Sequence, residues 1–276
     1  MSGNILYNLI YALVYGFTEF LGVDSTAHVR IFELLTGSDH TLPIMPIALR
    51  LGLIVALVVS CWPRLRRLMR ERSYATRSRR LRRTPDPMAK LDLQLLRTAL
   101  LPIVVGLVLY TKTRRLSYGF LMMSLVLLMN AVVLYVPRII NSGNKDGRSA
   151  SPFDGLLLGL GGLLGFVPGF SRIGSMLTAG AVAGFDRGYC LDLALLLSIP
   201  ALIGILVLDL LAFITAKTVV TMALLGAGLL YMLISFIGGW LAIVMMRYLS
   251  IKIGYTSFAY YSLGLALFSF VFYLVI

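Results

Sequence analysis

Long apolar runs separated by short polar breaks recur along the whole 276-residue chain. Several runs reach the length of about 20 residues that a helix needs to cross a bilayer. The chain lacks the series of short alternating strands that would form a membrane barrel. The pattern predicts an all-α, polytopic integral membrane protein that forms one domain over 1–276. The predicted spans are 42–62, 93–110, 116–136, 191–214, 219–246 and 256–276.

Two regions interrupt the apolar pattern with polar residues. In the first, the apolar segment 5–21 is followed at once by the polar run GVDSTAH at 22–28. In the second, the Gly-rich segment 153–167 leads into GFVPGFSRIGSMLTAG at 165–180. Irregular backbone persists at membrane depth only where protein buries it or where it lines a polar cavity. Each region is therefore predicted to form a re-entrant helix pair.

The two interrupted regions are similar enough to indicate an internal repeat. Each opens with Gly-Phe, at Gly16 and at Gly165, and continues into a polar run. Corresponding interrupted segments are typical of membrane proteins whose two halves are inverted repeats, with a binding site where the halves meet. We therefore predict an inverted-topology repeat, with a first half over 1–136 and a second half over 153–276.

Composition and charge support membrane insertion and indicate an orientation. The chain is 59% hydrophobic and 13% charged, whereas soluble domains average about 45–50% and about 25%. Of the net charge of +13, residues 64–90 contribute +9 through eleven basic and two acidic side chains. The positive-inside rule assigns this segment to a cytoplasmic loop, predicted at 63–92, with anionic lipid as a secondary contact. We do not expect nucleic-acid binding, because the segment lacks a folded platform with interleaved aromatics.

The first interrupted region carries a candidate nucleophile and base. If the residues after Gly22 are helical, Ser25 and His28 are three apart and Asp24 and His28 are four apart, on one face. A hydroxyl near an imidazole suits nucleophilic catalysis, because the imidazole can take the hydroxyl proton. Glu19 or Asp24 could orient the imidazole or help to hold a cation. The alternative is that Ser25 and His28 form only a polar contact between helices.

The second interrupted region carries a candidate anion-binding side chain, Arg172. An arginine at membrane depth costs several kcal/mol unless it faces a cavity or a partner, and its planar fork matches phosphate oxygens. The predicted helix N-terminus beside it also attracts anions. Gly169 and Gly174 would let a phosphate approach the backbone, although close helix packing is their more common role. The alternative for Arg172 is a structural ion pair with Glu19 or Asp209.

These motifs resemble those of a known family, the integral-membrane undecaprenyl-diphosphate phosphatases of the bacitracin-resistance type. GFTEFLGVDSTAH at 16–28 is similar to the family's EGLTEFLPxSSTGH, and PGFSRIGSMLTAG at 168–180 is similar to PGxSRSGxT. RLGLIVALVVSCW at 50–62 and SIPALIGILVLDL at 198–210 extend the resemblance over essentially the whole chain. The resemblance implies removal of the terminal phosphate from a polyprenyl (undecaprenyl) diphosphate, which regenerates the lipid carrier used in peptidoglycan and cell-wall synthesis.

The resemblance also implies roles for individual residues. Ser25 matches the nucleophile, His28 the base or acid, Glu19 a motif glutamate and Arg172 the diphosphate-binding arginine. A Mg²⁺ or Ca²⁺ ion is implied as cofactor, with Glu19 and Asp24 as its candidate ligands. The predicted phosphate contacts are Arg172, Ser171, Gly169, Gly174 and Thr26.

The resemblance implies a setting as well. It places the chain in the bacterial plasma (inner) membrane, with a site that faces the outer side and an inverted fold with two re-entrant helix pairs. The lipid diphosphate and membrane lipids are the expected partners, and whether the chain forms a homo-oligomer stays open.

The chain departs from the family pattern at several motif positions. Tyr15 stands where the family has a glutamate, Asp24 where it has a serine, and Arg50 where it usually has a glutamine. Ile173 and Met176 replace a serine and a threonine, which predicts a thinner polar lining of the site. Two alternatives therefore stay open: a non-catalytic relative that binds or transports a lipid phosphate or another anion, and a purely structural membrane subunit.

Overall fold

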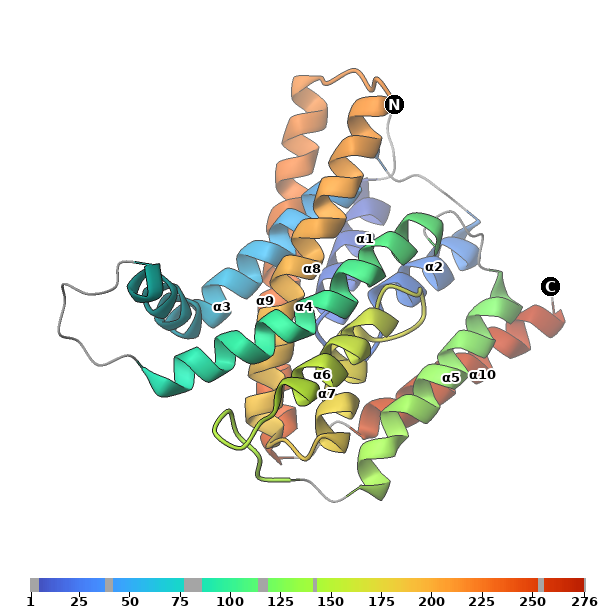
Figure 1. The fold of residues 1–276 in the computed structure, drawn as a ribbon. Helices are drawn as coiled ribbons and strands as arrows, with labels where there is room; N and C mark the ends of the chain where they lie inside the picture. The colour runs from blue at the N-terminus through green and yellow to red at the C-terminus, as the bar shows by residue number, and fades with distance from the viewer. Residues whose placement is uncertain are drawn as a thin grey trace.

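The computed structural model describes residues 5–37, 42–76, 86–113, 119–140, 143–252 and 256–275. These residues form ten α-helices (Figure 1). Residues 77–85 of the predicted basic loop and 116–118 of one predicted span lie outside the described residues. The helices are α1 (Ile5–Thr18), α2 (Ser25–Thr36), α3 (Met45–Thr76), α4 (Pro87–Thr113), α5 (Phe120–Ile139), α6 (Pro152–Leu164), α7 (Arg172–Val182), α8 (Arg187–Thr215), α9 (Met222–Lys252) and α10 (Ser257–Val275).

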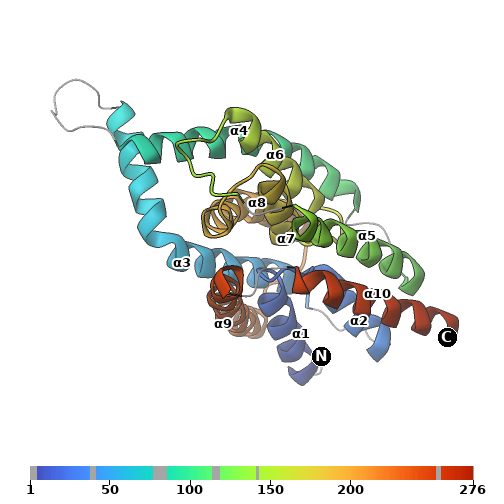
Figure 2. The ribbon, with the colours of Figure 1, turned by 90° about the horizontal axis from the view of Figure 1, so that it is seen from below.

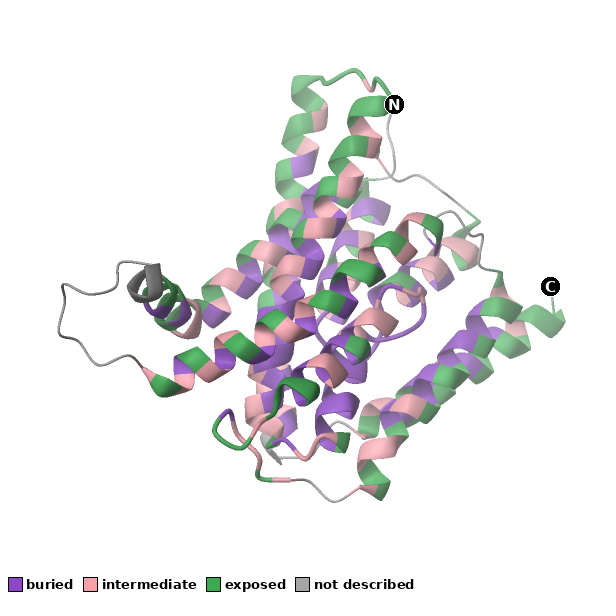
Figure 3. Ribbon diagram, in the orientation of Figure 1, coloured by how far each residue is buried: buried purple, intermediate pink, exposed green. Residues whose placement is uncertain are grey.

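Six of these helices, α3, α4, α5, α8, α9 and α10, are long and apolar enough to cross a membrane. Each overlaps a predicted span. Their outward faces carry large apolar side chains, such as Leu101, Val105 and Val108 of α4, which are 66%, 60% and 65% exposed. Figure 3 shows exposed positions along α5 and α10, whereas buried positions gather where the helices meet. Apolar outer faces suit lipid rather than water, and the chain is a multi-pass membrane protein.

Four shorter helices form two pairs, α1 with α2 and α6 with α7, where the sequence predicts re-entrant pairs. Asp24 caps α2 by accepting the Ala27 N–H at 2.7 Å, and Ser171 caps α7 by accepting the Gly174 N–H at 3.0 Å. Each cap satisfies an N–H that the first turn of a helix leaves unpaired. Each half thus has two short helices followed by three long ones. This order agrees with the predicted repeat, and the inversion of one half relative to the other stays a prediction.

Helices from the two halves interleave. α1 packs along α9, α6 packs along α4, and α5 packs along α10. Figure 2 shows α8 between the α4/α6 side and the α3/α9 side of the molecule, and α8 contacts α3, α4, α6, α7 and α9. Apolar side chains of α3 and α8, including Leu53, Leu57, Leu193 and Leu197, are almost completely buried there. The short pairs are therefore held between long helices of both halves.

The predicted basic loop over 63–92 is largely helical where the structure describes it. α3 continues past Pro63, and α4 begins before the predicted end of the loop. Figure 2 shows α3 bending along its course, as a helix with an internal proline does. Arg67, in the extended part of α3, is hydrogen-bonded to Asp86, and the guanidinium holds the pKa of that carboxyl at about 2.

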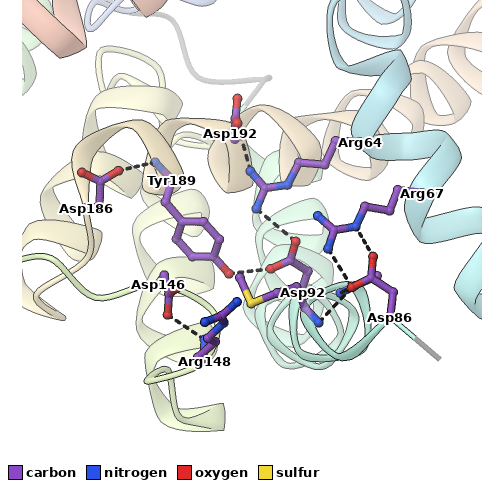
Figure 4. A network of polar contacts seen from close by, with 11 residues as sticks. Arg64, Arg67, Asp86, Asp92, Asp146, Arg148, Asp186, Tyr189 and Asp192 are labelled. Atoms are coloured by element: carbon purple, nitrogen blue, oxygen red, sulfur yellow. Dashed lines mark hydrogen bonds and ion pairs between the residues drawn. The ribbon is translucent and has the colours of Figure 1, made fainter. Parts of the chain in front are cut away.

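A polar network joins this part of α3 to two other helices (Figure 4). Arg64 forms ion pairs with Asp92 of α4 at 3.1 Å and with Asp192 of α8 at 2.9 Å. The Tyr189 hydroxyl donates to Asp92 at 2.6 Å. Acidic side chains of α4 and α8 neutralise basic charge on α3. The end of α3 is therefore helical, although its charge alone suggested a loop.

Candidate active site

A cavity of about 460 Å³ is lined by residues from both short pairs and from the long helices beside them. The first half contributes Glu19 and Ser25, and the second half contributes Phe166 and Arg172. Arg50 of α3 also lines it. The volume lies in the range of small-molecule sites. The two interrupted regions thus meet at one cavity, as a repeat with a site between its halves requires.

Glu19 connects the predicted nucleophile to the predicted anion-binding arginine. Its carboxylate is 8% exposed. Oε1 accepts a hydrogen bond from Arg172 Nη1 at 2.9 Å, and Oε2 accepts one from the Ser25 hydroxyl. Charge-assisted bonds of this kind are stronger than neutral ones and fix the geometry of both partners. The Ser25 hydroxyl and the Arg172 guanidinium therefore meet at a single carboxylate.

His28 is turned toward α10. Its Nδ1 lies 2.5 Å from the Asp24 carbonyl oxygen, and its Nε2 lies 2.8 Å from the hydroxyl of Tyr261, whose ring stacks on the imidazole. Burial lowers the pKa of His28, which favours the neutral imidazole. His28 is absent from the described residues that line the cavity. In this structure the Ser25 hydroxyl is hydrogen-bonded to Glu19 rather than to His28.

Asp24 joins the two halves through the backbone. Its Oδ2 accepts the Gly169 N–H at 2.8 Å as well as the Ala27 N–H. Burial raises the pKa of Asp24, which lies in the turn before α2, to about 7, although both N–H bonds act in the opposite direction. Gly169 has a φ of 100°, a conformation that glycine adopts at no steric cost. The Gly169 N–H, predicted to meet phosphate, is therefore bonded to Asp24.

Of the other predicted phosphate contacts, two stabilise the start of α7 and one lines the cavity. Ser171 is 0% exposed. Its N–H donates to Asn130 Oδ1 at 3.0 Å, and its hydroxyl donates to the Leu21 carbonyl oxygen at 3.3 Å. Gly174 is packed in the same turn and donates its N–H to Ser171. Ser171 and Gly174 thus hold the start of α7 in place, whereas Thr26 is exposed and lines the cavity.

Ile173 and Met176 lie in the hydrophobic core. Both are 0% exposed, and both belong to the cluster that surrounds α8. Neither is among the described residues that line the cavity. The expected thinning of the polar lining therefore does not occur at these positions, since apolar side chains there fill a packed interior.

The family model of the bacitracin resistance protein BacA matches residues 8–268. The chain belongs to this family. An undecaprenyl-diphosphatase of Methanobrevibacter smithii is 29% identical over 275 residues, which cover 94% of each chain. Undecaprenyl-diphosphatase 1 of Shouchella clausii is 27% identical over 273 residues, or 98% of this chain and 96% of the relative. An undecaprenyl-diphosphatase of a Synechococcus species is 32% identical over 205 residues, or 71% of this chain and 69% of the relative.

The described side chains of this BacA family member form no preassembled Mg²⁺ or Ca²⁺ site. Among the described residues, no group of three or more His, Cys, Asp or Glu side chains converges in a way that could hold a metal ion. Both Glu19 oxygens are engaged, and Asp24 Oδ2 accepts two backbone N–H groups. Mg²⁺ at phosphate sites is usually held by one or two carboxylates together with substrate phosphates, so an ion here would need phosphate oxygens beside Glu19 or Asp24. Tyr15, at the position of the family's first glutamate, lines the cavity with a phenol.

The contacts of Arg50 show which carboxylate is the ion-pair partner of Arg172, a choice between Glu19 and Asp209 that the sequence left open. Arg50 pairs with Asp209 of α8 and donates to the Tyr110 hydroxyl at 2.7 Å. Of the two carboxylates considered as partners of Arg172, Glu19 takes that role and Asp209 pairs with Arg50. The cavity lining of this BacA family member therefore includes Arg50 and Arg172, each beside its own carboxylate, and also Arg30, which is paired with Glu33 at 3.0 Å.

Proposed function

We propose that this BacA family member removes the terminal phosphate of undecaprenyl diphosphate and releases the monophosphate lipid carrier for cell-wall synthesis. The observation that carries this proposal is the contact of one buried carboxylate, Glu19, with both the Ser25 hydroxyl and the Arg172 guanidinium in a single cavity. The shared name of the relatives supports the substrate. The site supplies a hydroxyl nucleophile, a proton acceptor and a cation, which together suit phosphoryl transfer.

Arg172 binds the oxygens of the terminal phosphate. Its Nε is buried without a hydrogen-bond partner among the described residues, and such donors are nearly always satisfied in native proteins. A phosphate oxygen in the cavity would satisfy it. Arg172 is also the first residue of α7, where the helix dipole adds positive potential. Stabilising the charge that spreads over the phosphoryl oxygens is the main contribution of such a site.

Ser25 Oγ attacks the terminal phosphorus while Glu19 accepts the hydroxyl proton. The bond between that phosphorus and the bridging oxygen breaks, and the lipid monophosphate leaves with the bonding electron pair. Water then attacks the phosphoserine, which releases inorganic phosphate and returns the proton to Ser25. His28 is a positioning residue in this scheme, because its contacts hold the start of α2 against α10.

We propose that the protein lies in the plasma membrane, with the basic ends of α3 and α4 in the cytoplasm and the cavity facing the outer side. The positive-inside rule and the charge of residues 64–90 support this orientation. A cysteine introduced at the exposed position Arg66 tests it, because Cys61 and Cys190 are buried. An impermeant thiol reagent should label Arg66→Cys only after the membrane is opened, and labelling of intact cells would refute the orientation.

Phosphate release from undecaprenyl diphosphate by the purified protein in detergent tests the function. We expect release by the unaltered chain and a loss of about 10²-fold or more in Arg172→Ala and in Ser25→Ala. A radiolabelled terminal phosphate should be trapped on Ser25 in acid-quenched samples. Full activity in both variants would refute the mechanism. Movement of the lipid or of an anion across liposomes without hydrolysis would support the transport alternative instead.

A further inference from the structure

The proposed mechanism uses Arg172 but gives no role to Arg50, a second buried arginine on the cavity wall. Arg50 lies within the membrane-spanning helix α3 and is 9% exposed. A buried arginine inside a spanning helix is costly and marks a functional site by default. Because Arg50 lies on the cavity wall, it is placed to contact a ligand in the cavity.

The contacts of Arg50 leave one nitrogen of its guanidinium, Nε, without a hydrogen-bond partner among the described residues. Nη1 donates to Asp209 and to the Pro46 carbonyl oxygen at 3.4 Å, and Nη2 donates to Tyr110 at 2.7 Å. Nε is buried and has no hydrogen-bond partner among the described residues, as is also true of Arg172 Nε. A guanidinium has five donors, so an anion oxygen in the cavity can bind Arg50 while the contact with Asp209 is kept.

An aromatic bridge links Arg50 to Arg172. The Arg50 guanidinium lies 5.8 Å from the centroid of the Tyr110 ring, and that of Arg172 lies 5.4 Å from the centroid of Phe166. The two rings meet edge to face, with centroids 6.5 Å apart. Cation–π contacts of this kind add to the positioning of each guanidinium. Arg50 and Arg172 are thus held as separate cations on the wall of one cavity.

We propose that Arg50 is a second phosphate-binding residue, which contacts the phosphate that stays on the lipid while Arg172 binds the phosphate that is released. The assignment of the two phosphates rests on the function proposed above. Asp209 is the counter-ion of Arg50 when the site is empty, and its carboxylate opposes the arriving anion. On this assignment the subsite favours a diphosphate over a monophosphate, because a diphosphate carries one phosphate for each guanidinium group.

Binding of a non-hydrolysable probe, methylenediphosphonate, to the purified full chain in detergent tests this proposal by calorimetry. Arg50→Gln should weaken methylenediphosphonate about ten- to a hundredfold, the range expected for hydrogen bonds to a charged group. Inorganic phosphate, which Arg172 binds alone, should change by less than about threefold in Arg50→Gln. Asp209→Asn should tighten methylenediphosphonate, because it removes the opposing carboxylate. A purely structural ion pair would change the affinities for inorganic phosphate and for methylenediphosphonate alike, whereas a direct contact changes the affinity for methylenediphosphonate selectively.

Two further variants keep the test decisive. Arg50→Gln/Asp209→Asn removes both charges, which avoids the unpaired buried charge that can unfold a single variant. It should still bind the probe more weakly than the unaltered chain, because the Arg50 contact is lost, but less weakly than Arg50→Gln, because the opposing carboxylate is gone. Arg64→Gln is the matched control, because Arg64 lies in α3 and is ion-paired with Asp92 and Asp192 away from the cavity. It should leave probe affinity unchanged.

The outcomes separate this inference from the proposed function. Wild-type affinity in the double variant, or no binding of methylenediphosphonate by the unaltered chain, would overturn the Arg50 subsite. Arg50-dependent probe binding in a protein that releases no phosphate would keep the subsite and refute the hydrolysis. Phosphate release together with Arg50-independent probe binding would refute only the subsite.

Discussion

Replacing Glu19 with glutamine should slow phosphate release far more than replacing His28. Glu19 accepts hydrogen bonds from Ser25 and Arg172, and a glutamine of the same size cannot accept the Ser25 proton. Because a general base typically contributes about 10²–10⁴-fold, we expect Glu19→Gln to lower the rate by that factor. The loss corresponds to about 3–5 kcal/mol of activation free energy.

His28→Gln should have a much smaller effect on the rate. The imidazole contacts Tyr261 and the Asp24 carbonyl oxygen, and it is absent from the cavity lining. Loss of these hydrogen bonds costs about 0.5–1.5 kcal/mol each, mostly in stability. We therefore expect His28→Gln to lower the rate less than about tenfold.

The assay is the initial rate of phosphate release at saturating lipid diphosphate in detergent. Glu19→Gln also breaks a buried ion pair, which can cost about 3–5 kcal/mol of stability, so its melting temperature must be measured alongside. The variant should still bind inorganic phosphate, because removing the carboxylate leaves Arg172 more available to anions. An inactive His28→Gln beside an active Glu19→Gln would show that the imidazole is the base and that the contact between Glu19 and Ser25 is incidental.

Three further predictions test the packing and the ligand set. Gly169→Ala should lower the free energy of unfolding by about 1–3 kcal/mol, because a Cβ there would lie 2.5 Å from Val126 Cγ1 at a φ of 100°. In the same detergent melting assay Gly226→Ala should be neutral or slightly stabilising, since nothing lies within 4 Å of that position. Ile173→Ser, at a fully buried core position, should cost roughly 3 kcal/mol of stability without raising the rate. EDTA should lower phosphate release, and Mg²⁺ or Ca²⁺ should restore it, if Glu19 and Asp24 hold an ion together with substrate phosphates; release that EDTA leaves unchanged would refute the ion.

The sequence predicts the order of the helices well because the bilayer restricts which backbone structures can span it. A spanning segment must be long, apolar and internally hydrogen-bonded, so run length alone locates all six long helices. Polar breaks locate the two short pairs. The end of α3 is not predictable in this way. Residues after Pro63 carry the charge of a solvated loop, and their helix is stabilised by acidic side chains such as Asp92 and Asp192, which lie far away in the sequence.

The motifs identify Glu19, Ser25 and Arg172, but they do not determine which side chains meet. The spacing of Ser25 and His28 suggested a pair, yet His28 is turned toward Tyr261 of a helix 233 residues further along the chain. Spacing along one helix cannot reveal this rotation, because neighbouring helices set it. The choice of partner for Arg50 has the same origin, since α3 packs against α8 and thereby brings Asp209 within reach.

Three contacts at the site cross from one half of the chain to the other. Glu19 binds Arg172, Asp24 binds the Gly169 N–H, and the Ser171 hydroxyl binds the Leu21 carbonyl oxygen. The contacts of Asp24 explain why an aspartate stands where the motif has a serine. Its carboxylate oxygen reaches both the first turn of α2 and the turn before α7. The shorter side chain of a serine could not span this distance. The change at Asp24 thus alters how the halves are joined, while the carboxylate that accepts the proton, Glu19, stays where the motif has it.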